Sequence, residues 1–430
     1  MATCEKLQEI LEKYNIPATV LNKADSSRVT IFEVYLSIGA KLSALTRITN
    51  EIALHLGVEN VKIKLLGTQG IVGIEVPNTQ STTVSMKNIL NSDEFKNTNS
   101  KLSFGIGKDT SGNIVVGDLK EILHLLVAGA TGSGKSVFIN SLIASLLFKA
   151  SPKEVRLLLI DPKMVELTPY NGIPHLLAPV ITDANMVSPV LKHMVREMDR
   201  RYKVFELNAN HFNLTIRNIE DFNRVTLKEA NMTYIVIVID ELADLVMTAN
   251  KTVEENIIKL AQKARGAGIF LVIATQRPDR NVVTGLLKAN MPSKIAFTVS
   301  SSVNSRIILD ESGAEKLLGK GDMLYLPTGA MKPTRIQGTF ISDDEINKIL
   351  TFVKENNDPP VFDKHIMSIL NGENKMNATD LVRAVLGDVE GVEKVIEGIE
   401  IAQKDKEAIS KLVPPGTKIR TEVHYGKSKK

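Results

Sequence analysis

The stretch that decides the fold of this chain is Gly129-Ala130-Thr131-Gly132-Ser133-Gly134-Lys135-Ser136, which fits the pattern G-x-x-x-x-G-K-[ST]. An apolar run ends just before it at Ala128, and a helical run over residues 137–149 follows it. The glycines let successive backbone N–H groups face phosphates, and the helix N-terminus adds its dipole. This context predicts a nucleotide-binding P-loop. The residues expected to bind the nucleotide are Gly129, Ala130, Thr131, Gly132, Ser133, Gly134, Lys135, Ser136 and Val137.

Side chains for hydrolysis come from this loop and from a second motif. Lys135 would reach the β and γ phosphates, and the Ser136 hydroxyl would ligate Mg²⁺. Farther along, the apolar strand 235–239 ends in Asp240 and Glu241. Asp240 is placed to hold Mg²⁺ through water, and Glu241 is placed to orient and deprotonate the attacking water.

The second acid of this pair helps to identify the nucleotide. A GTPase switch would not need Glu241, so the Asp-Glu pair favours ATP hydrolysis with a general base. The alternative interpretation is an acidic turn that only caps the next helix. The following strand ends in Thr275 and Gln276, and either is a candidate to align the water.

Around these motifs, from Leu123 to about Phe340, apolar strands alternate with helical segments, which is typical of a mostly parallel sheet covered by helices. The expected strands are 123–128, 155–160, 234–239, 269–274 and 295–299. A helix is expected around residues 185–208, and its charge run is Arg196, Arg200, Arg201 and Lys203. We interpret this run as a solvated or subunit-facing surface, with a DNA site as the less favoured alternative.

The segments on either side have a different pattern. Residues 29–35, 61–65 and 71–76 are strand-like and follow a helical start, which indicates a smaller α+β unit. A polar stretch over 91–100 is expected to be a loop or linker. The double proline at Pro359-Pro360 breaks the chain, and helical periodicity and a polar tail follow it. The predicted domains are therefore residues 1–100, 101–350 and 351–430.

Composition narrows the class of protein. Hydrophobic residues make up 43% and charged residues 24%, as in ordinary globular proteins, and no apolar stretch is long enough for a membrane helix. The single cysteine, Cys4, cannot form an internal disulfide, and the start of the chain lacks a secretory signal, so we expect a cytoplasmic protein. A net charge of +4 permits a nucleic-acid partner through local placement of charge without indicating one.

Further motifs, in the same order along the chain, resemble those of the FtsK/SpoIIIE DNA translocases. They cover residues 124–128, 160–167, 170–176, 240–245, 264–269, 274–278, 305–310 and 319–324. The front unit resembles the α domain of this family at residues 32–35, 41–43 and 73–78. The resemblance extends over about residues 7–350.

We expect an α/β fold in which a motor with a mostly parallel sheet follows a smaller α+β domain and precedes a small, mainly helical module. The resemblance implies that the motor is a RecA-like P-loop domain. It implies a hexameric ring with ATP between neighbouring motors and double-stranded DNA through the centre. A neighbour would then supply a cation to the transferring phosphoryl group. The candidates for this role are Arg306 and then Arg265, with a structural salt bridge as the alternative for each.

Two lysines are candidate DNA contacts. The resemblance makes Lys288 a candidate pore-loop contact to phosphate, with an ordinary surface lysine as the alternative. Lys294 stands where the family usually carries arginine, which keeps the charge but loses the bidentate fork. Typical members also carry N-terminal membrane helices and a C-terminal winged helix. Membrane helices are not predicted here, and residues 361–430 do not match the winged-helix motif.

Four functions are compatible with these observations. The leading hypothesis is an ATP-driven double-stranded DNA translocase that acts in chromosome segregation at cell division or sporulation. The second is a related motor for plasmid, conjugative or phage DNA transfer or packaging. The third is a DNA-binding scaffold that does not hydrolyse ATP, against which Glu241 argues. The fourth is a secretion-type ATPase, which the single P-loop and the front unit disfavour.

Overall fold

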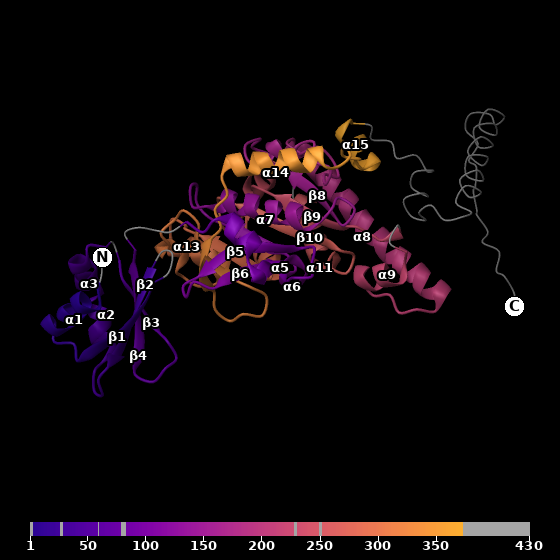
Figure 1. The fold of residues 1–430 in the computed structure, drawn as a ribbon. Helices are drawn as coiled ribbons and strands as arrows, with labels where there is room; N and C mark the ends of the chain where they lie inside the picture. The colour runs from indigo at the N-terminus through magenta and orange to yellow at the C-terminus, as the bar shows by residue number, and fades with distance from the viewer. Residues whose placement is uncertain are drawn as a thin grey trace, which may run out of the picture.

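A computed structural model describes residues 3–25, 29–58, 60–78, 83–227, 230–248 and 252–372 of the chain. The described residues form a small front unit, indigo in Figure 1, and a larger unit built on a second sheet, which is the predicted motor. Most of the predicted C-terminal module, residues 373–430, lies outside the described residues.

The front unit is a four-stranded antiparallel sheet packed against three helices. Its strand order is β1-β2-β4-β3. Alternate residues of the central strands, including Phe32, Val34 and Ile74, are buried against the helices. The predicted strands correspond to β2, β3 and β4, but the sequence analysis missed β1, an edge strand with several polar residues. The elements are α1 (Cys4–Lys13), β1 (Ala18–Asp25), β2 (Val29–Leu36), α2 (Leu42–Arg47), α3 (Thr49–Leu56), β3 (Lys62–Leu65) and β4 (Ile71–Pro77).

The motor is built on a nine-stranded sheet in the order β6-β5-β13-β12-β11-β7-β10-β9-β8. The run from β11 to β8 is parallel and contains the five predicted strands. The remaining four strands are antiparallel and were not predicted, so the α/β class is confirmed with a mixed sheet. The strands are β5 (Ser103–Asp109), β6 (Ile114–Asp118), β7 (Leu125–Ala128), β8 (Val155–Ile160), β9 (Tyr234–Ile239), β10 (Ile269–Thr275), β11 (Ser293–Phe297), β12 (Asp322–Leu326) and β13 (Thr334–Gly338).

Side chains of the parallel strands alternate between two cores, because successive strand residues face opposite sides of a sheet. Leu125 and Val127 of β7 pack in one core with α7 and α14, whereas Leu126 packs in the other with α8, α10, α11 and α12. The helices of the motor are α6 (Leu119–Ile122), α7 (Lys135–Lys149), α8 (Ala184–Phe212), α9 (Ile219–Val225), α10 (Leu242–Thr248), α11 (Thr252–Lys263), α12 (Gly285–Asn290), α13 (Ser302–Leu309), α14 (Asp343–Glu355) and α15 (Lys364–Leu370), with short turns η1 (Thr168–Tyr170) and η3 (Ala314–Lys316).

The expected linker over residues 91–100 is wrong in part. Two short helices, α4 (Met86–Asn91) and α5 (Asp93–Lys96), enter this region, and the Ser92 hydroxyl caps α5 by accepting from the Phe95 N–H at 3.2 Å. Phe95 is buried in the same core as α7 and α14. The buried Phe95 ring therefore packs this stretch against the core, which its mostly polar composition does not indicate. The domain limits at residues 100 and 350 stay predictions.

Two contacts join the front unit and the segment that follows it to the motor. Arg335 of β13 donates to Glu75 of β4 at 3.2 Å and to Asp322 of β12 at 2.7 Å, and all three side chains are largely buried. After the front unit, residues 84–86 run beside Phe340. The Phe340 N–H donates to Val84 O at 2.7 Å, and the Met86 N–H donates to Phe340 O at 2.9 Å.

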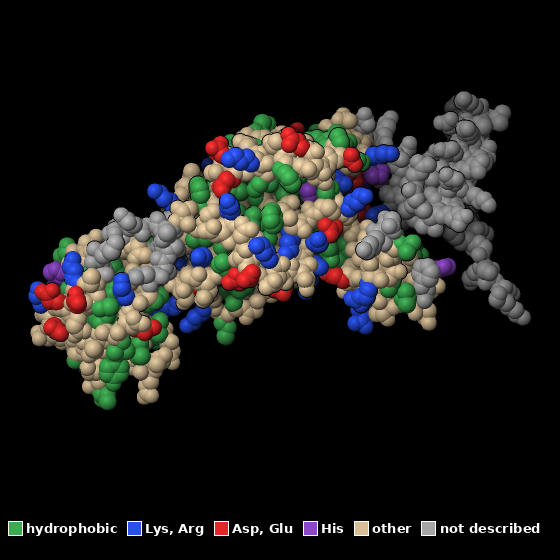
Figure 2. Space-filling model, in the orientation of Figure 1, with side chains coloured by type: hydrophobic (Ala, Val, Ile, Leu, Met, Phe, Trp, Pro, Cys, Tyr) green, Lys and Arg blue, Asp and Glu red, His purple; other side chains and the backbone are tan. Residues whose placement is uncertain are grey.

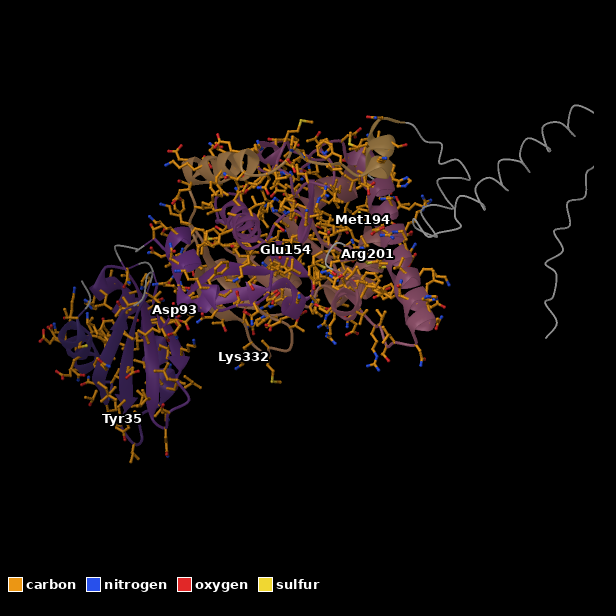
Figure 3. The ribbon with its side chains drawn as sticks, turned by 45° about the vertical axis from the view of Figure 1, so that its right-hand side comes forward. Tyr35, Asp93, Glu154, Met194, Arg201 and Lys332 are labelled. Atoms are coloured by element: carbon orange, nitrogen blue, oxygen red, sulfur yellow. The ribbon has the colours of Figure 1, made fainter. Side chains whose placement is uncertain are left out.

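The interpretation of the α8 charge run as a solvated surface is wrong for Arg201. This side chain is only 5% exposed and donates to the Glu197 carboxylate at 2.8 Å and to Ala267 O at 2.7 Å. Arg200 binds the same carboxylate at 2.7 Å. Arg201, labelled in Figure 3, therefore ties α8 to the turn before β10, because a buried guanidinium needs partners for its charge.

The end of the described chain docks on α8. Asp363 caps α15 by accepting from the N–H groups of His365 and Ile366, both at 2.9 Å, and lies 3.6 Å from Nε2 of His193 on α8. Burial alone would raise the pKa of Asp363, but the neighbouring His193 and the hydrogen bond from the Ile366 N–H bring this pKa down to about 2. The folded protein therefore favours the ionised form of Asp363 more strongly than the unfolded chain does.

We expect Asp363→Asn to destabilise the protein by about 2 kcal/mol at pH 6. A lowered pKa contributes stability above the ordinary value near 3.8, and this contribution is lost as the pH falls toward 2. Urea unfolding at pH 6, 4 and 3 measures the difference, with the exposed Asp358→Asn as the control. An equal penalty at all three pH values would contradict the carboxylate's role.

Candidate active site

The P-loop connects the end of β7 to the start of α7, as predicted. Its backbone is closely packed, because Gly321 donates its N–H to Ser133 O at 2.8 Å. Gly134 has a φ of 112°, and a Cβ at this position would lie 2.5 Å from the Gly321 nitrogen. Only glycine fits both the left-handed backbone and this approach. The turn at residues 319–321 therefore supports the P-loop from one side.

A cleft of about 630 Å³ opens over the P-loop. Of the predicted nucleotide-binding residues, Ala130, Thr131, Gly132, Gly134, Lys135, Ser136 and Val137 line it. Gly129 and Ser133 do not. Gly129 packs against Phe297, and the Ser133 hydroxyl is buried. The rest of the lining includes residues 320–321 and 337–341, which the sequence analysis did not assign to the site.

Lys135 and Asp240 form an ion pair beneath the cleft. Lys135 Nζ lies 2.7 Å from Asp240 Oδ1 and donates to Asp240 O at 2.8 Å, with the two residues only 3% and 0% exposed. The other carboxylate oxygen, Asp240 Oδ2, is buried and has no hydrogen-bond partner within the described ranges. This oxygen and the Ser136 hydroxyl fit Mg²⁺, which prefers oxygen ligands and takes its others from phosphate and water.

Glu241 is held by four neighbours, one of which is the Ala243 N–H, 3.3 Å from its Oε1. Its Oε1 accepts from Thr275 Oγ1 at 2.7 Å, and its Oε2 accepts from Lys163 Nζ at 3.1 Å. The backbone N–H of Gln276 is 3.1 Å from both oxygens. Gln276 itself lines the cleft, and its Oε1 accepts from Thr131 Oγ1 at 2.9 Å. The structure therefore brings the predicted Glu241 and Gln276 together beside the P-loop.

The sequence analysis missed the contact between Lys163 and Glu241. Burial alone would lower the pKa of Lys163, but the hydrogen bond to Glu241 and the nearby acids raise it above its ordinary value. The turn that carries Lys163 is fixed by Asp161, whose Oδ2 accepts from the N–H groups of residues 166 and 167. The sequence carried one signal for this contact, because Lys163 follows β8 and Glu241 follows β9, the parallel neighbour of β8.

The candidate cations for a neighbouring site lie away from this cleft. Arg306 on α13 lines a second cleft of about 370 Å³, together with Arg280 and Lys288. Arg265 is exposed between α11 and β10, at the amino edge of the parallel strands. The structure therefore does not bring either predicted arginine to the P-loop of its own chain, and their roles stay predictions.

Both candidate DNA contacts are engaged by one acid. Asp310 lies 2.6 Å from Lys288 Nζ and 3.6 Å from Lys294 Nζ. Burial lowers the pKa of Lys294, and this effect exceeds the opposing influence of Asp310. On the face shown in Figure 2, basic side chains are interspersed with acidic ones.

Among the helices of the described residues, none has both the length and the apolar character that a membrane span requires.

Two family models match the chain. The FtsK alpha domain matches residues 1–78, and the FtsK/SpoIIIE family matches residues 85–280. The chain is 50% identical over 371 residues to the DNA translocase FtsK of Caldanaerobacter subterraneus, covering 86% of this chain and 51% of that protein. It is 48% identical over 358 residues to the DNA translocase SpoIIIE of Bacillus subtilis, covering 81% and 45%. The chain thus spans about half the length of these curated relatives.

Solved structures support the predicted fold. The pCW3 conjugation coupling protein TcpA, solved with ATPγS, aligns with a TM-score of 0.57 at 23% identity, covering 81% of this chain and 99% of that one. The cytoplasmic domain of the Type VII secretion ATPase EccC from Thermomonospora curvata aligns with a TM-score of 0.52 at 19% identity, covering 65% and 35%. At these identities the likeness concerns the fold alone, which is that of P-loop ATPase motors.

We expect Gly134→Ala to lower the free energy of unfolding of the motor by about 1–3 kcal/mol, because a strained φ and a backbone clash arise together. Gly285→Ala is the matched control, since its Cβ would meet nothing within 4 Å. Urea unfolding measures both. Equal midpoints for the two variants would show that the turn at residues 319–321 does not press on the P-loop.

Proposed function

Since this chain belongs to the FtsK/SpoIIIE family, we propose that its motor hydrolyses ATP and uses the energy to move along double-stranded DNA. The observation that carries the hydrolytic part is the position of Glu241, next to the P-loop and between Thr275 and Lys163. The choice of DNA rests on the relatives, which are named DNA translocases.

The P-loop binds the triphosphate through its backbone N–H groups and through Lys135. Lys135 exchanges its bond with Asp240 for one with phosphate oxygens. Ser136 and Asp240 Oδ2 are the residues that would hold Mg²⁺. When bound, this ion neutralises charge on the phosphate oxygens.

Glu241 acts as the general base for the attacking water. Its carboxylate takes the water proton, while the Gln276 side chain, at the edge of the cleft, orients the same water. Lys163 and Thr275 are positioning residues, because their hydrogen bonds fix the Glu241 carboxylate in one place. A scaffold that does not hydrolyse ATP has no use for this arrangement.

We infer that the motor works as a hexameric ring. Arg306, and then Arg265, is the candidate to reach the nucleotide of a neighbouring subunit, since neither lines the cleft of its own chain. Lys288 and Lys294 contact DNA phosphates in the pore, exchanging their bonds with Asp310 for bonds with DNA. Contacts of this kind are independent of sequence and weaken with salt.

The proposed cellular role is chromosome segregation at cell division or sporulation, carried out by a motor at the cytoplasmic side. The front unit supports this role over plasmid or phage transfer, because it matches the alpha domain of FtsK over residues 1–78. Likeness to the conjugation protein TcpA extends over 81% of the chain but concerns the fold alone.

We expect Glu241→Gln to lower ATP turnover at least about 100-fold while leaving ATP bound, because the base is lost and the P-loop is intact. Lys135→Ala should lose nucleotide binding itself. Phosphate release and equilibrium binding distinguish the two variants. Turnover at the parent rate in Glu241→Gln would remove Glu241 from the role of base.

We expect long duplex DNA to raise the ATPase rate, and the motor to displace a third strand from a triplex substrate. Both effects should fall as salt rises, because the grip on DNA is made through phosphates. Glu241→Gln is the control that should abolish displacement. An ATPase rate that duplex DNA leaves unchanged would contradict the translocase proposal while sparing the ATPase.

A further inference from the structure

The lining of the nucleotide cleft has two chemically different parts. Lys135 and Ser136 belong to the P-loop part, and Thr339, Phe340 and Asp343 belong to the other. The P-loop part suits phosphates. The following inference concerns the other part and rests on the proposed binding of a nucleotide.

Phe340 lines this part of the cleft and carries an aromatic ring. The residue is 47% exposed although most large apolar side chains of the motor are buried. Its backbone is fixed on both sides by the hydrogen bonds to Val84 and from Met86. An exposed ring on a fixed backbone forms a platform on which a flat ligand can stack.

Thr339 supplies an independent sign of a ligand. This residue is 3% exposed and lines the cleft, yet its Oγ1 has no hydrogen-bond partner among the residues that the structure describes. A buried hydroxyl without a partner is costly, so the site gains from a ligand that can bond to it. Asp343 also lines the cleft, and its negative charge disfavours a phosphate near it.

We propose that Phe340 stacks on the purine base of the bound nucleotide and that the Thr339 hydroxyl bonds to the polar edge of this base. The backbone has little left to read the base, because the N–H groups of residues 338, 339 and 340 already donate to Gly321, Ile106 and Val84. Recognition is therefore by the face of the ring more than by its edge, and ATP and GTP analogues bind within a few-fold of each other.

Calorimetric titration with two probes tests this proposal on the full chain with Mg²⁺ present. The probes are a non-hydrolysable ATP analogue and inorganic tripolyphosphate, which has no base. Phe340→Ala should lower the affinity for the ATP analogue about tenfold or more and leave the affinity for tripolyphosphate unchanged. Phe340→Tyr keeps the ring and should keep the parent affinity. Thr339→Val should weaken the analogue about fivefold.

Phe352→Ala is the matched control, since Phe352 is an exposed ring on α14 that does not line the cleft. Parent affinity of Phe340→Ala for the analogue would overturn the proposal, as would an equal loss for both probes. So would a loss of assembly in sedimentation with affinity unchanged, which would assign Phe340 to a subunit contact.

The two proposals fail separately. If analogue binding depends on Phe340 but the chain does not turn over ATP, the proposed motor function is contradicted and the proposed stacking of the base on Phe340 is supported. Normal turnover with parent affinity in Phe340→Ala would do the reverse. A GTP analogue that binds 100-fold more weakly than the ATP analogue would overturn recognition by the face of the ring.

Discussion

Lys135 and Asp240 form an ion pair, 2.7 Å apart, in the interior of the motor, and the strand order of the sheet brings them together. Lys135 follows β7 and Asp240 follows β9, and β10 lies between these strands with the same direction. All three carboxyl ends therefore share one edge. The same order sets Gln276, after β10, between the P-loop and Glu241. Removing either charge would leave the other buried alone, which is strongly destabilising.

Much of this edge could be predicted from sequence, because each part is local. The P-loop, the acidic pair and the strands before them are contiguous runs whose periodicity and flanking residues are visible in one chain. The contact between Lys163 and Glu241 was harder, since it depends on which strands are neighbours. The exposure of Arg201 was predicted wrongly for a similar reason, because helical spacing does not show whether a charged side chain is exposed or buried.

The antiparallel half of the sheet was missed for a physical reason. β13 pairs with β5 through Ile336 and Asp109, so residues separated by most of the motor become neighbours. The strands are short, and β5 carries a register shift between Gly105 and Gly107. Pairing over such distances leaves no local pattern. The part of the cleft lining that includes Phe340 follows these strands and was missed with them.

The two attachments of the front unit have a mechanical consequence. Glu75 holds Arg335 on β13, and residues 84–86 hold Phe340 just beyond the same strand. Residues 337, 338 and 340 all line the nucleotide cleft. A force on the front unit would therefore reach the motor through β13 and Phe340, at residues that line the cleft. Such a force and the filling of the cleft would act on the same few residues.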